Sequence, residues 1–320
     1  MKRFSIVLLS LLVLGAFSGL AGAKTIKLGI VFDTGGLGDG SFNDAAYRGM
    51  VRAQKELGVE ATYVESHSMD DYEPNVRMLA EQGYDLIFGI GFMLTDAIDR
   101  VAQEYPDTKF GIIDSVVDQP NVVSVLFKEN EGSFLQGVIA GMMTKTDVVG
   151  FVGGMESPVI TRFEVGFVEG VKAVNPDAEI LIGYTGKFDD PGKGKELALA
   201  QIAKGADVIY HASGACGHGV IEAAKEKGVY AIGVDSDQSG EAPNHVISSM
   251  LKRVDVAVFD GAKMLVEGNF KPGVLNLGLA ESGVDTAWSP GVNVPAEVKE
   301  KVADYAEKII SGEITVPATK

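Results

Sequence analysis

Two aspartates in equivalent positions carry the clearest chemical signal of the sequence. Asp114 follows the apolar run FGII, and Asp235 follows the apolar run AIGV. Each carboxylate is therefore expected just beyond a buried strand, where it can accept hydrogen bonds from a vicinal diol or from paired N–H groups. Either residue alone could instead cap a helix or meet solvent. Their matching placement in the two halves of the chain favours a site for a donor-rich small molecule.

Several aromatic residues are expected near the same strand ends. They are Phe32, Phe42, Phe92 and Phe188. Most phenylalanines belong to a core, but two on opposite sides of a cleft can sandwich a flat ring. Such stacking contributes about 1–3 kcal/mol per base in nucleic-acid complexes. Lys252 follows the stretch HVISSM and is expected to be an exposed cation near the rim of that cleft.

Catalytic and metal-binding patterns are weak. His211 and His218 lack a third ligand at a spacing suited to zinc, and Cys216 between them has no nucleophile-elbow signature. The favoured interpretation of SGACGHG is a loop in which Ser213 and Gly214 form hydrogen bonds with a ligand. We therefore expect no catalytic residue, no metal and no cofactor.

The glycine-rich segment DTGGLGDGS, residues 33–41, fits neither G-x-G-x-x-G nor the phosphate loop. Asp33 and Asp39 would repel a phosphate. One interpretation is a flexible turn with Ser41 as a helix N-cap. The other is a loop that opens toward an uncharged ligand.

Short apolar runs alternate with amphipathic stretches along the chain, which predicts parallel sheets with crossover helices. The predicted strands span residues 27–32, 61–64, 86–90, 109–113, 122–126, 148–152, 179–182, 208–211, 230–234 and 246–249. The predicted helices begin near residues 43, 72, 95, 132, 161, 192, 219, 255 and 296.

An internal repeat indicates two lobes with one plan. Five pairs of positions match at separations of 119 to 122 residues: Gly29 and Gly150, Gly49 and Gly170, Asp70 and Asp189, Gly83 and Gly205, and Asp114 and Asp235. Ligands of open parallel sheets bind beyond the carboxyl ends of the strands. If the lobes face each other, the loops after the strands border one cleft that can hold a small molecule.

Composition and charge limit the classes of protein to which the chain can belong. The chain has 320 residues, enough for two α/β domains of about 150 residues each. Its 44 acidic and 28 basic side chains give a net charge of −16, which argues against nucleic-acid binding. A single cysteine excludes a disulfide framework.

The first 23 residues have the pattern of a secretory leader. Lys2 and Arg3 precede an apolar run over residues 6–16, and residues 21–23 are small. We predict a cleaved signal peptide, with an uncleaved anchor as the alternative that the short apolar run disfavours. No cysteine follows the run, so no lipid attachment is expected. The mature protein is then predicted to be periplasmic.

Six segments of the chain resemble one known family. They are GIVFDTGGLGDGSFNDAAYRG, GYDLIFGIGF, FKENEGSFLQGVIAG, VGFVGGMESPVITRFEVGFVEG, GADVIYHASG and GVDSDQ. Together they resemble the basic membrane protein family of substrate-binding proteins of ABC importers, best known through purine nucleoside receptors. The resemblance covers residues 24–290. It implies an α/β, type I periplasmic-binding-protein fold, with two Rossmann-like lobes of parallel sheets joined by a three-crossover hinge.

The same resemblance implies contacts to a base. Two aromatic rings would sandwich it, and the positions that match are Phe32 and Phe188. Asn43 and Asp114 resemble the residues that bind the edge of the base.

The resemblance further implies contacts to a ribose, from Gly214, Asp235 and Lys252. The chain departs from the family in two respects. Many members are lipoproteins, whereas this leader lacks the lipid-bearing cysteine, and the chain is acidic where the family name suggests basic proteins.

The predicted division of the chain follows from the crossovers. Residues 1–23 are the signal peptide, residues 24–127 and 255–288 form the first lobe, and residues 128–254 and 289–320 form the second. The lobe of the C-terminal helix is left open.

The resulting functional prediction is a monomeric, non-catalytic receptor. It would close around a nucleoside, with a purine nucleoside expected, and deliver it to an ABC permease in the inner membrane. The alternatives are the same fold with a sugar or a flat vitamin-like ligand, a ligand-binding protein of a sensor or chemoreceptor, and an exported enzyme acting on nucleosides.

Overall fold

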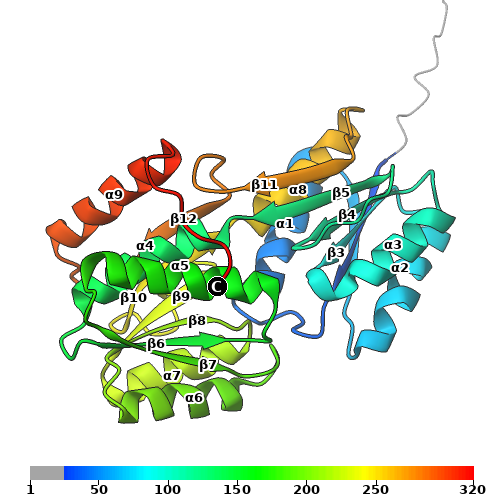
Figure 1. Ribbon diagram of the computed structural model, residues 1–320. Coiled ribbons are helices and arrows are strands. Elements are labelled where there is room, and N and C mark those ends of the chain that lie inside the picture. The colour runs from blue at the N-terminus through cyan, green and yellow to red at the C-terminus, as the bar shows by residue number, and fades with distance from the viewer. Residues whose placement is uncertain (1–24) are drawn as a thin grey trace, which may run out of the picture.

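The computed structural model describes residues 25–320, which form two α/β lobes (Figure 1). The predicted signal peptide and the position where a lipid-bearing cysteine would stand lie outside the described residues. Each lobe has a six-stranded sheet, and helices cover both faces of each sheet.

The first lobe contains a fully parallel sheet in the order β11-β5-β4-β3-β1-β2. Its strands are β1 (Lys27–Phe32), β2 (Glu60–Val64), β3 (Leu86–Ile90), β4 (Lys109–Ile113), β5 (Val122–Phe127) and β11 (Gly273–Leu277). Its helices are α1 (Phe42–Leu57), α2 (Tyr72–Glu81), α3 (Thr95–Glu104) and α8 (Val254–Val266), with short 3₁₀ turns η1 (Met69–Asp71) and η2 (Phe92–Leu94). Helices α1 and α8 pack on one face and α2 and α3 on the other.

The second lobe repeats this arrangement in the order β12-β10-β9-β8-β6-β7. Its strands are β6 (Val148–Gly153), β7 (Glu179–Tyr184), β8 (Val208–Ala212), β9 (Tyr230–Asp235), β10 (Val246–Lys252) and β12 (Val284–Trp288). Its helices are α4 (Glu129–Met143), α5 (Pro158–Val174), α6 (Pro191–Ala203), α7 (Cys216–Lys227) and α9 (Ala296–Ile310). Because the five strands beyond β11 and β12 follow the same order in both lobes, the predicted two-lobed, Rossmann-like fold is confirmed.

Two matched glycines explain part of the sequence repeat. A Cβ atom on Gly49 of α1 would lie 2.3 Å from the carbonyl oxygen of Asp255 on α8. A Cβ atom on Gly170 of α5 would lie 2.0 Å from the carbonyl oxygen of Phe134 on α4. Neither space admits a side chain. The repeat therefore preserves close backbone contact between the paired helices of each lobe.

The chain crosses between the two sheets three times: after β5, after β10 and after β11. Backbone hydrogen bonds join these connections, from Lys128 N–H to the oxygen of Leu277 (3.0 Å) and from Arg253 N–H to the oxygen of Gly283 (2.9 Å). The third crossover lies between β11 and β12, and not after residue 288 as the sequence predicted. The reason is that β12 pairs antiparallel with β10, with Lys252 opposite Val284. Residues 284–288 thus belong to the second sheet.

The C-terminal segment packs on the second lobe. Helix α9 contacts α4, and the ring of Tyr305 lies 5.2 Å from that of Phe134. Beyond α9, Asn130 donates from Nδ2 to the carbonyl oxygen of Val316 at 2.8 Å, which holds the tail against α4. These contacts place the last helix with the second sheet.

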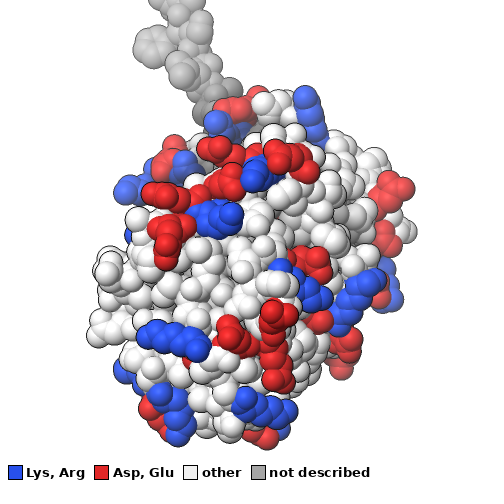
Figure 2. All heavy atoms as spheres, turned by 60° about the vertical axis from the view of Figure 1, so that its left-hand side comes forward, with Lys and Arg blue, Asp and Glu red and all other residues white. Residues whose placement is uncertain are grey.

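Charged side chains of both signs are interspersed on the face of the molecule shown in Figure 2. Many form surface ion pairs, as Lys195 does with Glu222 (2.8 Å) and Glu226 (3.2 Å). None of the helices within residues 25–320 is both long and apolar enough to cross a membrane.

Candidate functional site

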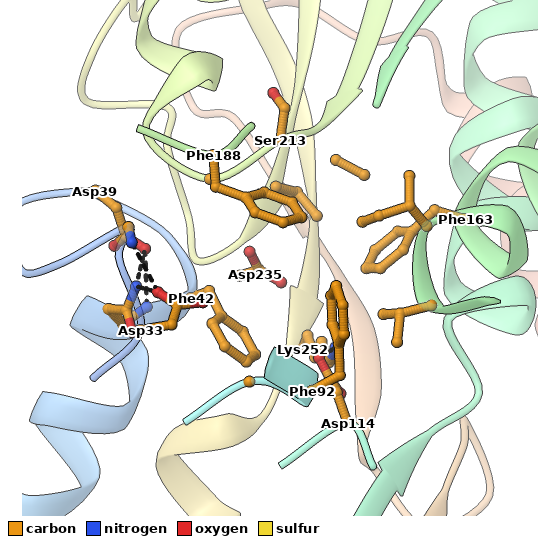
Figure 3. Close-up of a pocket in the computed structure, with 18 residues that line it drawn as sticks. Asp33, Asp39, Phe42, Phe92, Asp114, Phe163, Phe188, Ser213, Asp235 and Lys252 are labelled. Carbon is orange, nitrogen blue, oxygen red and sulfur yellow. Dashed lines mark hydrogen bonds and ion pairs between the residues drawn. The ribbon is translucent and has the colours of Figure 1, made fainter. Parts of the chain in front are cut away.

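A pocket lies where the carboxyl ends of the two sheets meet (Figure 3). The first lobe contributes Asp33, Gly35, Asp39, Phe42, Asn43, Gly91, Phe92 and Asp114. The second lobe and its crossovers contribute Val159, Ile160, Phe163, Phe188, Ala212, Ser213, Gly214, Val234, Asp235 and Lys252. The structure thus brings together six of the seven predicted ligand-binding residues, and Phe32 is the exception.

The aromatic walls of the pocket come from both lobes. Phe188 faces Phe42 and Phe92 across the space, with Phe163 at one side (Figure 3). The rings of Phe92 and Phe188 lie 6.4 Å apart at an interplanar angle of 75°. Aromatic rings of both lobes therefore line the pocket, and such rings can pack against a flat ligand.

Phe32 does not line this slot, so its predicted role as one face of the sandwich is wrong. It is fully buried in the core of the first lobe, and its ring lies 5.7 Å from that of Tyr63. Side chains alternate between the two faces of a strand, and Phe32 points into the core. The glycine-rich loop then returns the chain so that Phe42, the first residue of α1, reaches the cleft.

A buried cluster of charges forms the floor of the pocket. The Lys252 amine lies 2.6 Å from Asp114 Oδ2 and 2.9 Å from Glu129 Oε1, and Arg162 donates from Nε to Glu129 Oε2 at 2.5 Å. Lys252 is 1% exposed and Glu129 is fully buried. Burial disfavours the charged form of Lys252, but Asp114 and Glu129 outweigh it and keep the pKa of the amine above its ordinary value.

Lys252 is therefore not the exposed rim cation that the sequence suggested. The strand β10 extends through residue 252, which directs the side chain inward beneath the aromatic rings, 5.1 Å from the centre of Phe42. Sequence reasoning missed Glu129 and Arg162 altogether. The only feature of the sequence that could have pointed to this pair is the position of Glu129 in FKEN, where the chain first crosses between the lobes.

The glycine-rich loop is organised by its own carboxylates. Asp39 accepts hydrogen bonds from the backbone N–H groups of Ser41 (2.9 Å), Asn43 (2.8 Å) and Asp44 (3.1 Å). Asp39 thus satisfies the free N–H groups at the start of α1, a role that the sequence suggested for Ser41. The Ser41 hydroxyl instead donates to Asp235 Oδ2 in the other lobe.

Asp114 and Asp235 share an unusual backbone conformation as well as a matching position. Their φ angles are 68° and 63°, in the left-handed region that few residues other than glycine adopt. Backbone strain of this kind is common at functional sites. Burial raises the pKa of Asp235 to about 7.

Direct hydrogen bonds join the lobes beside the pocket. Besides the Ser41–Asp235 contact, Ser236 donates from Oγ to the carbonyl oxygen of Ser41 at 3.0 Å, and Arg48 donates to Ser236 Oγ at 2.6 Å. His218 of α7 lies 3.1 Å from the carbonyl oxygen of Gly38 through Nε2, and 2.8 Å from Glu241 through Nδ1. In this conformation the two lobes are in contact.

We expect the His218 contact to make stability depend on pH. The adjacent Glu241 raises the pKa of His218 to about 9, and the protonated ring can donate both to Glu241 and to Gly38. The stabilisation is fully present below about pH 6.5, the ordinary value, and is lost as the pH rises through 9. Melting temperatures between pH 6 and 10 should therefore fall less steeply for His218→Ala than for the wild type.

The control for this measurement is His67→Ala, at an exposed histidine of the first lobe. It should follow the wild-type slope, which also contains the titration of groups such as Asp235. An unchanged slope in His218→Ala would contradict the assignment.

Burial shifts the pKa values of Cys216 and His211, which the sequence raised as candidates. Burial raises the pKa of the Cys216 thiol and lowers the pKa of His211 to about 4, so neither is activated. Within residues 25–320, no group of three or more His, Cys, Asp or Glu side chains is arranged to hold a metal ion.

Comparison with known proteins identifies a family. The family model described as Bmp, ABC transporter substrate-binding protein PnrA-like, matches residues 26–320. A Lactococcus lactis protein named "ABC transporter nucleoside-binding protein BmpA" is 41% identical, over 94% of this chain and 92% of its own length. A Pyrococcus abyssi protein named as an uncharacterised lipoprotein is 40% identical, over 86% of this chain and 72% of its own length.

A solved structure shows the same architecture. The ABC transporter solute-binding protein from Aeropyrum pernix superposes with a TM-score of 0.84 at 33% identity, over 91% of this chain and 94% of its own. The family model covers nearly all the residues that the structure describes, and the relatives extend over most of their own lengths. The chain therefore belongs to the Bmp family of ABC transporter substrate-binding proteins.

Proposed function

We propose that this protein binds a nucleoside, with a purine nucleoside as the preferred ligand, between its two lobes outside the cytoplasm, and delivers it to the permease of an ABC importer. The observation that carries the proposal is the combination of aromatic rings from both lobes with buried hydrogen-bond acceptors in one pocket. Phe42 and Phe188 would stack on the base. A Lactococcus lactis relative that is named as nucleoside-binding supports the same ligand class.

The polar groups divide between base and sugar. Asn43 and Asp114 each have a buried oxygen without a hydrogen-bond partner in residues 25–320, and both line the pocket. They would accept hydrogen bonds from the edge of the base. Asp235, Gly214 and Lys252 would contact the ribose, with Asp235 accepting from its hydroxyl groups.

The charge of the cleft also favours an uncharged ligand. Asp33, Asp39, Asp114 and Asp235 line the pocket, and Lys252 is the single cationic residue among the described residues that line it. Placing a phosphate beside these carboxylates would cost free energy through like-charge repulsion. A nucleoside fits this balance better than a nucleotide does.

Isothermal titration of refolded mature protein with inosine, guanosine, adenosine, cytidine and ribose tests the proposal. Refolding removes any ligand carried over from the host. Binding of purine nucleosides with a Kd of about 1 μM or below, near −8 kcal/mol, with none for ribose, supports it. Absence of binding to every nucleoside by folded protein would overturn it and would point to another flat ligand.

We expect Asp235→Ala to weaken nucleoside binding at least about tenfold, or about 1.4 kcal/mol, and to leave the fold intact. The variant removes the acceptor proposed for the ribose, but also the contact with Ser41. The matched control is Ser41→Ala, which removes only the contact between the lobes. Equal losses of affinity in the two variants would contradict a direct contact between Asp235 and the ligand.

A further inference from the structure

The side-chain amide of Asn43 is held by two carboxylates. Its Nδ2 group donates to Asp33 Oδ1 at 2.9 Å and lies 3.3 Å from Asp39 Oδ2. All three residues are buried, and Figure 3 shows this network at the edge of the pocket. The two N–H bonds of the amide are thereby taken up by acceptors of the protein itself.

Neither carboxylate is free to turn away. Asp33 Oδ1 also accepts from the backbone N–H of Gly35 at 2.9 Å. Asp39 holds the backbone N–H groups at the start of α1 through both of its oxygens. Asp33 Oδ2 lies close to Gly91, where an added Cβ atom would be 2.9 Å from it. The two acceptors are therefore fixed in place before any ligand binds.

A reversed Asn43 amide would be strongly disfavoured. Its oxygen would then face Asp33 Oδ1 and Asp39 Oδ2 with no hydrogen atom between them, because ionised carboxylates only accept. The amide oxygen consequently remains on the opposite side. It is buried and has no hydrogen-bond partner in the described part of the chain. An acceptor left in this state costs free energy unless a ligand donates to it.

We propose that Asp33 and Asp39 are positioning residues that lock the Asn43 amide with its oxygen toward ring nitrogen N1 of a bound purine, so that the cleft selects a purine that carries a hydrogen on N1. This inference rests on the proposed nucleoside function. Inosine and guanosine carry a hydrogen on ring nitrogen N1, whereas adenosine presents a lone pair there. The lone pair would face a fixed acceptor. The cleft therefore binds 6-oxopurine nucleosides in preference to adenosine.

The test measures Kd for inosine and adenosine by titration at pH 8, where Asp33, with a pKa of about 6, is ionised. Wild-type protein should bind inosine at least about tenfold more tightly than adenosine. The reason is that Asn43 Oδ1 would stay buried without a hydrogen-bond donor in the adenosine complex. In Asp33→Asn, the closer of the two acceptors is replaced by a group that can also donate, so that only Asp39 still opposes a reversed Asn43 amide. The ratio of the two Kd values should fall at least threefold, a change that a general loss of stability would not produce.

Asp44→Asn provides the matched control. Asp44 is another carboxylate beside the same loop, and it accepts from the backbone N–H groups of Gly38 and Gly40 at 2.9 Å each. The preference for inosine in this variant should stay within about twofold of the wild-type ratio. A fall of the ratio in Asp33→Asn alone supports the positioning role, and a ratio unchanged from wild type in Asp33→Asn overturns it.

A comparison that needs no variant keeps the inference testable if Asp33→Asn does not fold. Wild-type protein is titrated with 1-methylinosine, which lacks the N1 hydrogen, and with 7-deazainosine, which keeps it. Weaker binding of the first alone supports the inference, and equal binding of inosine and 1-methylinosine overturns it. Equal Kd values for inosine and adenosine also overturn the inference and leave the proposed function intact. Absence of binding to every nucleoside overturns both.

Discussion

Replacing Lys252 with methionine should lower the free energy of unfolding by about 3–5 kcal/mol. Methionine fills most of the volume of the lysine side chain but carries no charge. The change leaves Asp114 without its ion-pair partner and Glu129 with Arg162 alone. Because both carboxylates are buried, water cannot replace the lost partner. Denaturant unfolding followed by circular dichroism measures the difference.

Lys308→Met is the matched control. Lys308 pairs with Asp304 at 2.9 Å on the surface of α9, where side chains remain about one-third to one-half exposed. Exposed pairs of this kind contribute about 0–1 kcal/mol. A loss in Lys252→Met no larger than in Lys308→Met would show that the cluster is hydrated rather than buried.

A double variant separates the charge effect from the loss of packing. Combining Lys252→Met with Asp114→Asn removes the unpaired charge of Asp114 while it keeps the shape of that side chain, and Glu129 keeps its pair with Arg162. Much of the stability lost in the single variant should return, since the unpaired charge is the main cost. Failure to recover any stability would assign the loss to packing instead.

Replacing Phe188 with alanine should weaken nucleoside binding by about 1–3 kcal/mol, the value of one stacking contact with a base. Phe188 is only partly buried at the edge of the cleft, so the fold should tolerate the change. Phe42→Ala should weaken binding by a similar amount from the other lobe. Titration calorimetry with inosine measures both losses.

Phe32→Leu separates the two candidate aromatic positions of the first lobe. Because Phe32 lies wholly in the core, its replacement should reduce stability while the Kd of the folded protein stays within about twofold of wild type. The opposite pattern, in which Phe32→Leu weakens binding and Phe42→Ala does not, would show that Phe32 rather than Phe42 contacts the ligand.

The secondary structure and the repeated plan of the lobes could be read from the sequence. Alternating apolar runs and amphipathic stretches are local patterns, and ten of the twelve strands within residues 25–320 were predicted from them. The equivalent glycines Gly49 and Gly170 and the equivalent aspartates Asp114 and Asp235 were visible because each pair meets the same steric or chemical demand in both lobes.

The two strands that were missed, β11 and β12, lack such a pattern. The residues of β11 are nearly all exposed, and they form a strand because they pair with β5 at the edge of the sheet. Strand β12 exists through its pairing with β10. Pairing between segments that lie far apart in the sequence leaves little trace in either segment alone.

The sequence by itself determined the family, the two-lobed fold and most of the residues at the carboxyl ends of the strands. Only the tertiary structure decided that Phe42 rather than Phe32 faces the cleft, that Lys252 is buried with Glu129 and Arg162, and that residues 284–288 join the second sheet. The physical reason is common to all three. Residue type and spacing specify which elements form, whereas the direction of a side chain and its partner depend on the register and packing of elements that are distant in the chain.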